Sequence, residues 1–237
     1  KNYELTSSLI IKLRQSKYFC FKKKTESYEL IRKKYKLIFN CDSNNKITKK
    51  FFNKKFNKDY NSFAYTSIIE HDKLAKNNVA TQTFTKKGPI AFLPISNKKT
   101  SVVYSLKGNK NIGIESLIKK FNIKYKINKI NKVSCFELKS SDLRTYYHEN
   151  ILAFGDLLHK LHPLAGQGFN MSIRDLRILL SLIDKKINYG LDLDSSIFEE
   201  FEKKMKHKNF IFSNGIDLIY EFFNFDRKIR SNNLSRI

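Results

Sequence analysis

The stretch ILAFGDLLHKLHPLAGQGFNMSIRD, residues 151–175, decides how this sequence is read. It opens with a short apolar run typical of a buried strand, which ends at Gly155 and is followed at once by Asp156. A loop containing Pro163 and two glycines then leads into apolar residues at helical spacing. The order therefore predicts a strand, a loop and a helix in direct succession.

Each part of this stretch suits the binding of a nucleotide-like cofactor. A carboxylate at the carboxyl end of a strand, such as Asp156, can accept hydrogen bonds from sugar hydroxyls. Gly166 and Gly168 allow the backbone to approach a ligand, and the N–H groups that open a helix favour negative charge. Two simpler readings stay open: Asp156 is an ordinary turn or cap residue, and Gln167 and Asn170 only cap the following helix.

Working outward, the rest of the chain reads as strands in the middle and helices at the end. Apolar residues from Phe169 to Ile183 recur on one predicted helix face. A further helix is predicted to start at Ser196, where Ser196 and Glu199 form a capping box, and a third covers residues 210–223. Another helix is predicted over residues 4–16. Short strands are predicted over residues 35–41, 63–71, 79–85, 90–95, 101–106, 135–138 and 150–155.

Charge and cysteine content exclude several classes of protein. The 237 residues carry a net charge of +24, from 46 Lys+Arg against 22 Asp+Glu, but 38 of these bases are Lys and 8 are Arg. Residues 1–150 contribute +22 and residues 151–237 only +2. Nucleic-acid readers favour Arg, so we interpret the charge as a solvated Lys-rich surface of an AT-rich genome and expect no nucleic-acid partner. The three scattered cysteines fit a reduced, cytoplasmic protein, and no metal site is expected because His159 and His162 lack further ligands.

The quoted stretch resembles the second flavin-binding motif of FAD-dependent aromatic-ring hydroxylases of the para-hydroxybenzoate-hydroxylase type, closest to the branch of ubiquinone biosynthesis. Residues 80–94 (ATQTFTKKGPIAFLP) resemble a strand pair of that branch, which ends in a GP-x-A-x-LP element. Glu70 and His71 fit its preceding strand, and residues 198–209 resemble its YE..R..DN helix. The resemblance covers nearly the whole chain.

The resemblance implies an α/β (α+β) fold: an FAD-binding Rossmann-like domain with an inserted, mostly antiparallel β-sheet substrate domain and C-terminal helices. The expected boundaries are residues 1–50 and 141–185 for the FAD-binding domain, 51–140 for the substrate domain and 186–237 for the helices. The family opens with a βαβ unit bearing GxGxxG, and none of the eight glycines here forms that motif. We therefore expect the sequence to lack about the first quarter of such an enzyme.

The resemblance also assigns the cofactor-binding residues. Asp156 is expected to hydrogen-bond the ribityl chain of FAD, and the backbone from Pro163 to Gly168 to approach the isoalloxazine edge. The family's middle motif falls on Asp42, with Ser43 where the family has Gly. The expected set is Gly155, Asp156, Pro163, Leu164, Ala165, Gly166, Gln167, Gly168, Asn170 and Asp42; no residue is assigned as catalytic acid or base.

By resemblance, the expected activity is hydroxylation of the aromatic ring of a polyprenylated phenol, with O₂ and NAD(P)H, through a flavin hydroperoxide. The expected location is cytoplasmic or peripheral on the inner membrane, in association with a ubiquinone-synthesis complex. Two alternatives stay open at this point: another flavin-dependent hydroxylase or epoxidase, and a non-catalytic basic binding protein.

Overall fold

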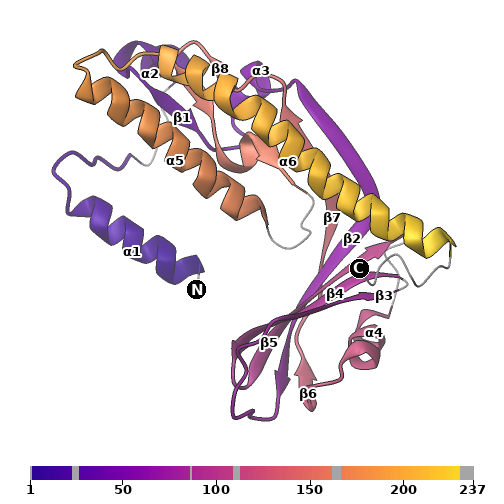
Figure 1. The fold of residues 1–237 in the computed structure, drawn as a ribbon. Coiled ribbons are helices and arrows are strands. Elements are labelled where there is room, and N and C mark those ends of the chain that lie inside the picture. Colours follow the sequence, from indigo (N-terminus) through magenta and orange to yellow (C-terminus); the bar gives the residue numbers. More distant parts are fainter. Residues whose placement is uncertain (1, 23–26, 86, 109–112, 162–166, 230–237) are drawn as a thin grey trace.

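The computed structural model describes residues 2–22, 27–85, 87–108, 113–161 and 167–229, which form two sheets and six α-helices (Figure 1). The helices are α1 (Asn2–Arg14), α2 (Tyr28–Lys34), α3 (Lys46–Phe51), α4 (Ile114–Phe121), α5 (Gln167–Asn188) and α6 (Ser196–Ile229). The strands are β1 (Ile38–Asn40), β2 (Lys55–His71), β3 (Thr81–Thr85), β4 (Gly88–Ser96), β5 (Lys99–Lys107), β6 (Ile127–Ile130), β7 (Ser134–Leu143), β8 (Tyr147–His148), β9 (Ile151–Ala153) and β10 (His159–Lys160).

The smaller sheet has the order β1-β9-β8, and its central strand β9 is completely buried. β1 and β9 run parallel, in the register Ile38↔Ile151 to Asn40↔Ala153. The apolar faces of α5 and α6 pack on this sheet and form its core with the fully buried Phe198 and Phe201. A parallel pair buried in this way explains why residues 151–153 are uniformly apolar rather than alternating.

The larger sheet has seven strands in the order β10-β7-β2-β5-β4-β3, with β6 paired to the far end of β2. All its pairs are antiparallel, as expected for strands joined by short turns. α4 covers one face, where Ile114 and Ile118 pack on Ile69, Ile90 and other buried residues. The mixture of helices with an antiparallel sheet confirms the predicted fold class.

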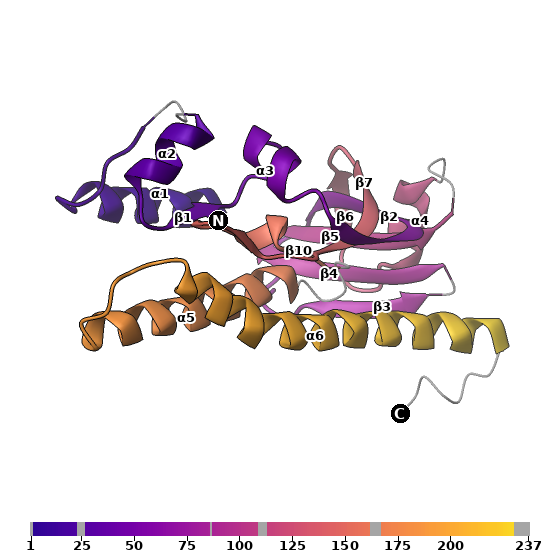
Figure 2. The same cartoon turned by 90° about the horizontal axis from the view of Figure 1, so that it is seen from above.

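The chain passes between the sheets from β1 through α3 to β2, from β7 to β8 and from β9 to β10. The chain leaves β9 through a short 3₁₀ turn (Gly155–Leu157) and enters β10, which pairs with β7 of the larger sheet. α6 extends past the smaller sheet along the larger one, and its distal part is tied to β2 by an ion pair of 2.8 Å between Lys58 and Glu221 (Figure 2). The strand–loop–helix stretch therefore lies at the junction of the two sheets.

Several sequence predictions need correction. The two helices predicted from Ser196 and over 210–223 are one continuous helix, α6, which contains no proline and runs through Asn214 and Gly215 without a break. The capping box is wrong, because Ser196 is already helical and donates to the Asp194 carboxylate, while Glu199 pairs with Lys203. α4 and β6 lie between residues 107 and 132, where the sequence predicts neither a helix nor a strand.

The apolar face predicted for α5 is also not its buried face. Phe169, Ile173, Leu176 and Leu180 are between 39% and 65% exposed, whereas Met171, Leu179 and Leu182 are buried. The helix therefore carries apolar residues on two sides, and periodicity alone does not tell which side packs on the smaller sheet.

Replacing Phe201 by Ala is expected to destabilise the protein by about 3–5 kcal/mol, because it opens a cavity in the core beneath α6. Phe210 on the same helix is 63% exposed, so Phe210→Ala is expected to change the free energy of unfolding by less than about 0.5 kcal/mol. Urea unfolding of both variants measures the difference. Equal effects would contradict the packing of α6 described above.

Candidate functional site

Parallel pairing of β1 with β9 brings the two predicted carboxylates to one edge of the smaller sheet. Asp42 follows β1, and Asp156 follows β9, so both lie beyond the carboxyl ends of neighbouring strands. The pairing continues to this edge, because the Phe154 N–H donates to the Asn40 carbonyl at 2.9 Å. Both aspartates are exposed, and Asp156 makes no hydrogen bond or ion pair with any described residue. Its carboxylate is therefore free to accept hydrogen bonds from a ligand.

Gly155 turns the chain at this edge. Its φ of +66° is in the left-handed region, which glycine adopts without strain. A Cβ built there would meet nothing within 4 Å, so the backbone angle, not crowding, requires glycine. The Leu158 N–H then closes the 3₁₀ turn on the Gly155 carbonyl at 2.9 Å. This turn places Asp156 on the surface while Leu157 and Leu158 enter the core.

The loop after β1 is held by a polar cluster. The buried amide of Asn40 donates to the Thr48 hydroxyl at 2.8 Å and accepts from the Asn45 amide at 2.7 Å. One carboxylate oxygen of Asp42 accepts the Asn44 N–H at 2.8 Å, which is an Asx turn. The sequence prediction assigned only Asp42 of this loop to the site. The supporting residues Asn40, Asn45 and Thr48 could have been recognised from the Asn and Thr residues that flank Asp42 in the sequence.

α5 begins at Gln167 and Gly168, as the sequence predicts, and the Ser172 hydroxyl donates to the Gly168 carbonyl at 3.3 Å. Asn170 is exposed in the first turn. The free N–H groups at the start of a 22-residue helix favour a negatively charged ligand group. His162, Pro163, Leu164, Ala165 and Gly166 lie outside the described residues.

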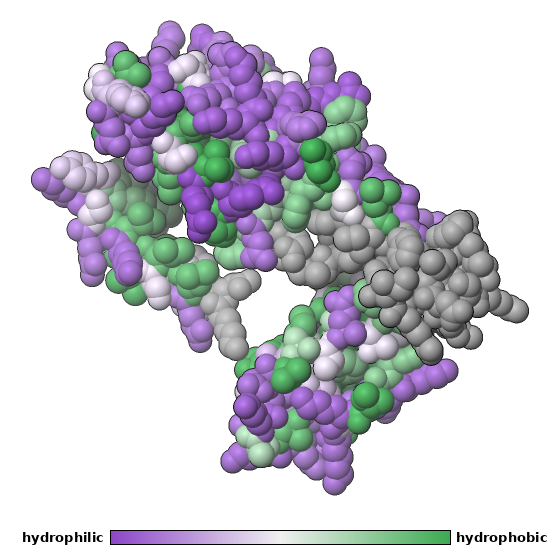
Figure 3. All heavy atoms as spheres, in the orientation of Figure 1, coloured by the Kyte–Doolittle hydropathy of each residue, from purple (hydrophilic) through white to green (hydrophobic). Residues whose placement is uncertain are grey.

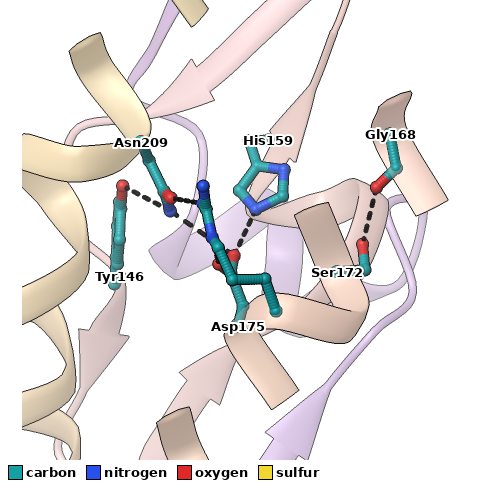
Figure 4. Close-up of polar contacts among 7 residues, drawn as sticks. Tyr146, His159, Gly168, Ser172, Asp175 and Asn209 are labelled. Atoms are coloured by element: carbon teal, nitrogen blue, oxygen red, sulfur yellow. Dashed lines mark hydrogen bonds and ion pairs between the residues drawn. The ribbon is translucent and has the colours of Figure 1, made fainter. Parts of the chain in front are cut away.

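A buried polar network lies behind this helix start (Figure 4). His159 Nε2 and Asp175 Oδ2 are 2.5 Å apart, and both side chains are 1% exposed. Asp175 also accepts hydrogen bonds from Arg174 at 3.1 Å and from the Asn209 amide at 3.4 Å. Asn209 in turn accepts from Arg174 and donates to the Tyr146 hydroxyl. The network joins β10, α5, α6 and the segment before β8.

The network gives His159 and Asp175 a structural role that the sequence did not suggest. From the sequence alone, Arg174 and Asp175 could be an ordinary surface pair, but Asp175 is buried because it partners His159. His159 opens β10, the strand before residues 162–166, and Asp175 lies in the third turn of α5, the helix after them. Their hydrogen bond therefore fixes both flanks of the loop relative to each other. The i, i+3 spacing of His159 and His162 suggests metal ligation and does not indicate that His159 pairs with Asp175.

A cavity of about 880 Å³ lies elsewhere, between α6 and the segments at the start of β2 and around β8. Its walls include Phe56, Tyr147, Glu199, Lys203 and Phe210. None of the predicted cofactor residues that the structure describes lines it. It touches the buried network only at Tyr146, whose pKa is raised because the phenol is buried.

Comparisons with known proteins give one domain match and several relatives. Residues 113–189 match the family described as "FAD binding domain". The chain is 23% identical over 238 residues to "Ubiquinone biosynthesis monooxygenase COQ6, mitochondrial" of Schizosaccharomyces pombe, covering 79% of this chain and 50% of that protein. It is 29% identical over 153 residues to "3-demethoxyubiquinol 3-hydroxylase" of Escherichia coli, covering 60% and 39%. The chain thus spans half or less of the length of these relatives.

Solved structures share the fold at lower identity. The flavin-dependent brominase Bmp2 (triple mutant) superposes with a TM-score of 0.61 at 14% identity, covering 81% of this chain and 53% of that one. PqsL from Pseudomonas aeruginosa, described as a probable FAD-dependent monooxygenase, gives a TM-score of 0.60 at 15% identity, covering 85% and 59%.

Replacing Asp175 by Asn is expected to destabilise the protein by about 2–4 kcal/mol, because His159 and Arg174 lose a buried charged acceptor. Asp184→Asn, at an exposed position of the same helix, serves as the control and is expected to cost less than about 0.5 kcal/mol. Chemical denaturation measures both. A silent Asp175→Asn would show that the network contributes no stability.

Proposed function

We propose that the chain belongs to the FAD-dependent hydroxylases and that the whole protein is an FAD-dependent monooxygenase of ubiquinone biosynthesis. Its substrate would be a polyprenylated phenol, hydroxylated on the ring with O₂ and NAD(P)H. The relatives' names support the substrate class, and the fold alone does not, because a brominase shares it.

The observation that carries the proposal is the arrangement at the carboxyl end of β9. Asp156 offers an unpaired, exposed carboxylate directly after the strand, and the start of α5 lies within the matched FAD binding domain. A carboxylate at a strand end suits the hydroxyls of a ribityl chain, and a helix N-terminus suits negative charge on a flavin ring. The donor set thus fits the flavin end of FAD.

Bound FAD would supply the redox and oxygen chemistry, and the residues of this chain would position it. Asp156 would hold the ribityl hydroxyls, and the free carboxylate oxygen of Asp42 lies at the same sheet edge. The N–H groups at the start of α5 would stabilise negative charge on the ring. The His159–Asp175 hydrogen bond would keep this helix start in place relative to β10. No acid or base among these residues is needed for the reaction.

We further propose that the protein works at a membrane surface, because a polyprenylated substrate resides in the bilayer. Lysines concentrate in residues 1–150, and a Lys-rich surface is attracted to anionic lipid. Among the residues that the structure describes, no helix combines the length and apolar character needed to cross a bilayer. Binding at the surface, in or near a ubiquinone-synthesis complex, is the mode that this proposal requires.

In the whole protein, Asp156→Ala is expected to lower FAD retention at least tenfold, because the ribityl chain loses a charged acceptor that contributes about 1.5–3 kcal/mol. Flavin absorbance after gel filtration measures retention. Asp184→Ala, which removes an exposed carboxylate near the C-terminal end of α5, should retain flavin normally. Unchanged retention by Asp156→Ala would remove Asp156 from the proposed site.

A substrate test separates this proposal from other flavin hydroxylases. NAD(P)H oxidation by the whole protein should rise several-fold when a polyprenylated phenol is added and should form one hydroxylated product per NAD(P)H consumed. A phenol without the prenyl chain, or a catabolic substrate such as p-hydroxybenzoate, should give a much weaker response. Mass spectrometry of the product with ¹⁸O₂ provides the readout, and equal stimulation by all phenols would contradict the substrate class.

A further inference from the structure

The cavity of about 880 Å³ between α6 and β8 has no role in the proposed function. Its volume is within the range of pockets that hold small organic molecules. Asp42, Gly155 and Asp156 at the flavin edge do not line it, and neither does the described start of α5. A molecule bound in this cavity would therefore be a second ligand, separate from the cofactor.

Aromatic rings from separate elements line the cavity. Phe56 comes from β2, Phe210 from α6, Tyr147 from β8, and Tyr146 directly precedes β8. Phe56 and Phe210 are 58% and 63% exposed, so both rings have apolar surface that a ligand can cover. On the face of the molecule where α6 lies, Figure 3 shows hydrophobic groups in green between hydrophilic groups in purple. Covering such rings is a main source of binding energy, which favours a ligand with a ring and an apolar part.

The charged side chains of the lining already have partners. Each of its two lysines pairs with the glutamate one turn before it on α6, at 2.6 and 2.8 Å. Glu149 binds Arg32, which lies outside the cavity, at 2.9 Å, and Asp142 also has an interaction partner. No charge of the described lining is left for a ligand to neutralise, and the acids outnumber the lysines. The cavity therefore suits an uncharged molecule and disfavours an anion.

Two imidazoles in the lining have no hydrogen-bond partner among the residues that the structure describes. His207 is exposed on α6, and His148 stacks on Phe51 with the ring centroids 4.1 Å apart. A neutral imidazole has one nitrogen that donates and one that accepts, and a hydroxyl group can pair with either. A phenol hydroxyl is also uncharged at neutral pH, because its pKa is about 10. His207, which is not engaged in stacking, is therefore suited to bind a phenol hydroxyl.

The wall formed by the two tyrosines is fixed by contacts with the rest of the chain. Tyr146 donates its N–H to Glu202 at 3.1 Å, and its hydroxyl accepts from Asn209 in the buried network (Figure 4). The Tyr147 ring packs against the fully buried Phe198, with the ring centroids 6.5 Å apart. A ligand does not have to order these side chains, so its binding loses little entropy.

We propose that this cavity binds an uncharged phenol that carries an apolar chain. The ring and the chain cover Phe56 and Phe210, and the hydroxyl exchanges a hydrogen bond with His207. The chain is required by size, because a single ring fills only a small part of 880 Å³. The substrate of the proposed reaction has the same chemistry, but the inference concerns a separate place on the chain and needs no flavin.

Calorimetric titration of the 237-residue chain without FAD tests the proposal. The probe is 4-hexylphenol, for which we expect binding of one molecule per chain. The compound 4-hexylanisole, whose methyl ether cannot donate a hydrogen bond, should bind about fivefold more weakly. The compound 4-hexylbenzoate, which is an anion at neutral pH, should bind about tenfold more weakly or worse.

Matched variants test the lining. Phe210→Ala should weaken binding of 4-hexylphenol about tenfold, because the ligand loses one aromatic wall. Ile211→Ala, at the neighbouring exposed position that does not line the cavity, should change binding less than about twofold. His207→Phe keeps a ring but removes the hydrogen bond, so it should abolish the preference for 4-hexylphenol over 4-hexylanisole. Because all three positions are exposed, circular dichroism and thermal unfolding should show normal folding.

Amide exchange locates the bound phenol. It should slow exchange in residues 145–149, which line the cavity, and leave residues 155–157 at the flavin edge unchanged. Several outcomes would overturn the inference: 4-hexylphenol does not bind, 4-hexylbenzoate binds as tightly, Phe210→Ala and Ile211→Ala have equal effects, or protection appears at residues 155–157 instead. A whole protein that binds 4-hexylphenol in this cavity but never binds FAD would support the inference and count against the proposed function.

Discussion

The parallel pairing of β1 with β9 is the constraint on which the site depends. It brings the ends of two strands, about 110 residues apart in sequence, to one edge of the smaller sheet, so that Asp42 and Asp156 lie at the same edge. The helix that follows β9 packs on this sheet, which fixes where its N-terminal N–H groups lie. β9 is buried on both faces, so apolar packing from the two sides holds it in this pairing.

The His159–Asp175 hydrogen bond has a complementary role. The sheet fixes the strand ends, and this buried bond fixes the start of α5 against β10, on either side of residues 162–166. Arg174 and Asn209 extend the connection to α6, which in turn reaches the larger sheet through Lys58 and Glu221. The proposed flavin site at the smaller sheet is thus linked to the larger sheet by these polar contacts and not by apolar packing alone.

The sequence by itself determined the strand–turn–helix order of residues 151–175 and the meander of residues 81–107, because apolar periodicity, glycine and proline act over short distances. It did not determine that residues 196–229 form one helix, that Asp175 is buried or which side of α5 packs on the sheet. Helical periodicity does not distinguish the two sides of α5, because it holds equally for the exposed Phe169, Ile173 and Leu176 and for the buried Met171, Leu179 and Leu182. Only the position of the sheet, the partner His159 and the neighbouring α6 decide between the two faces, since burial is a property of the tertiary contacts.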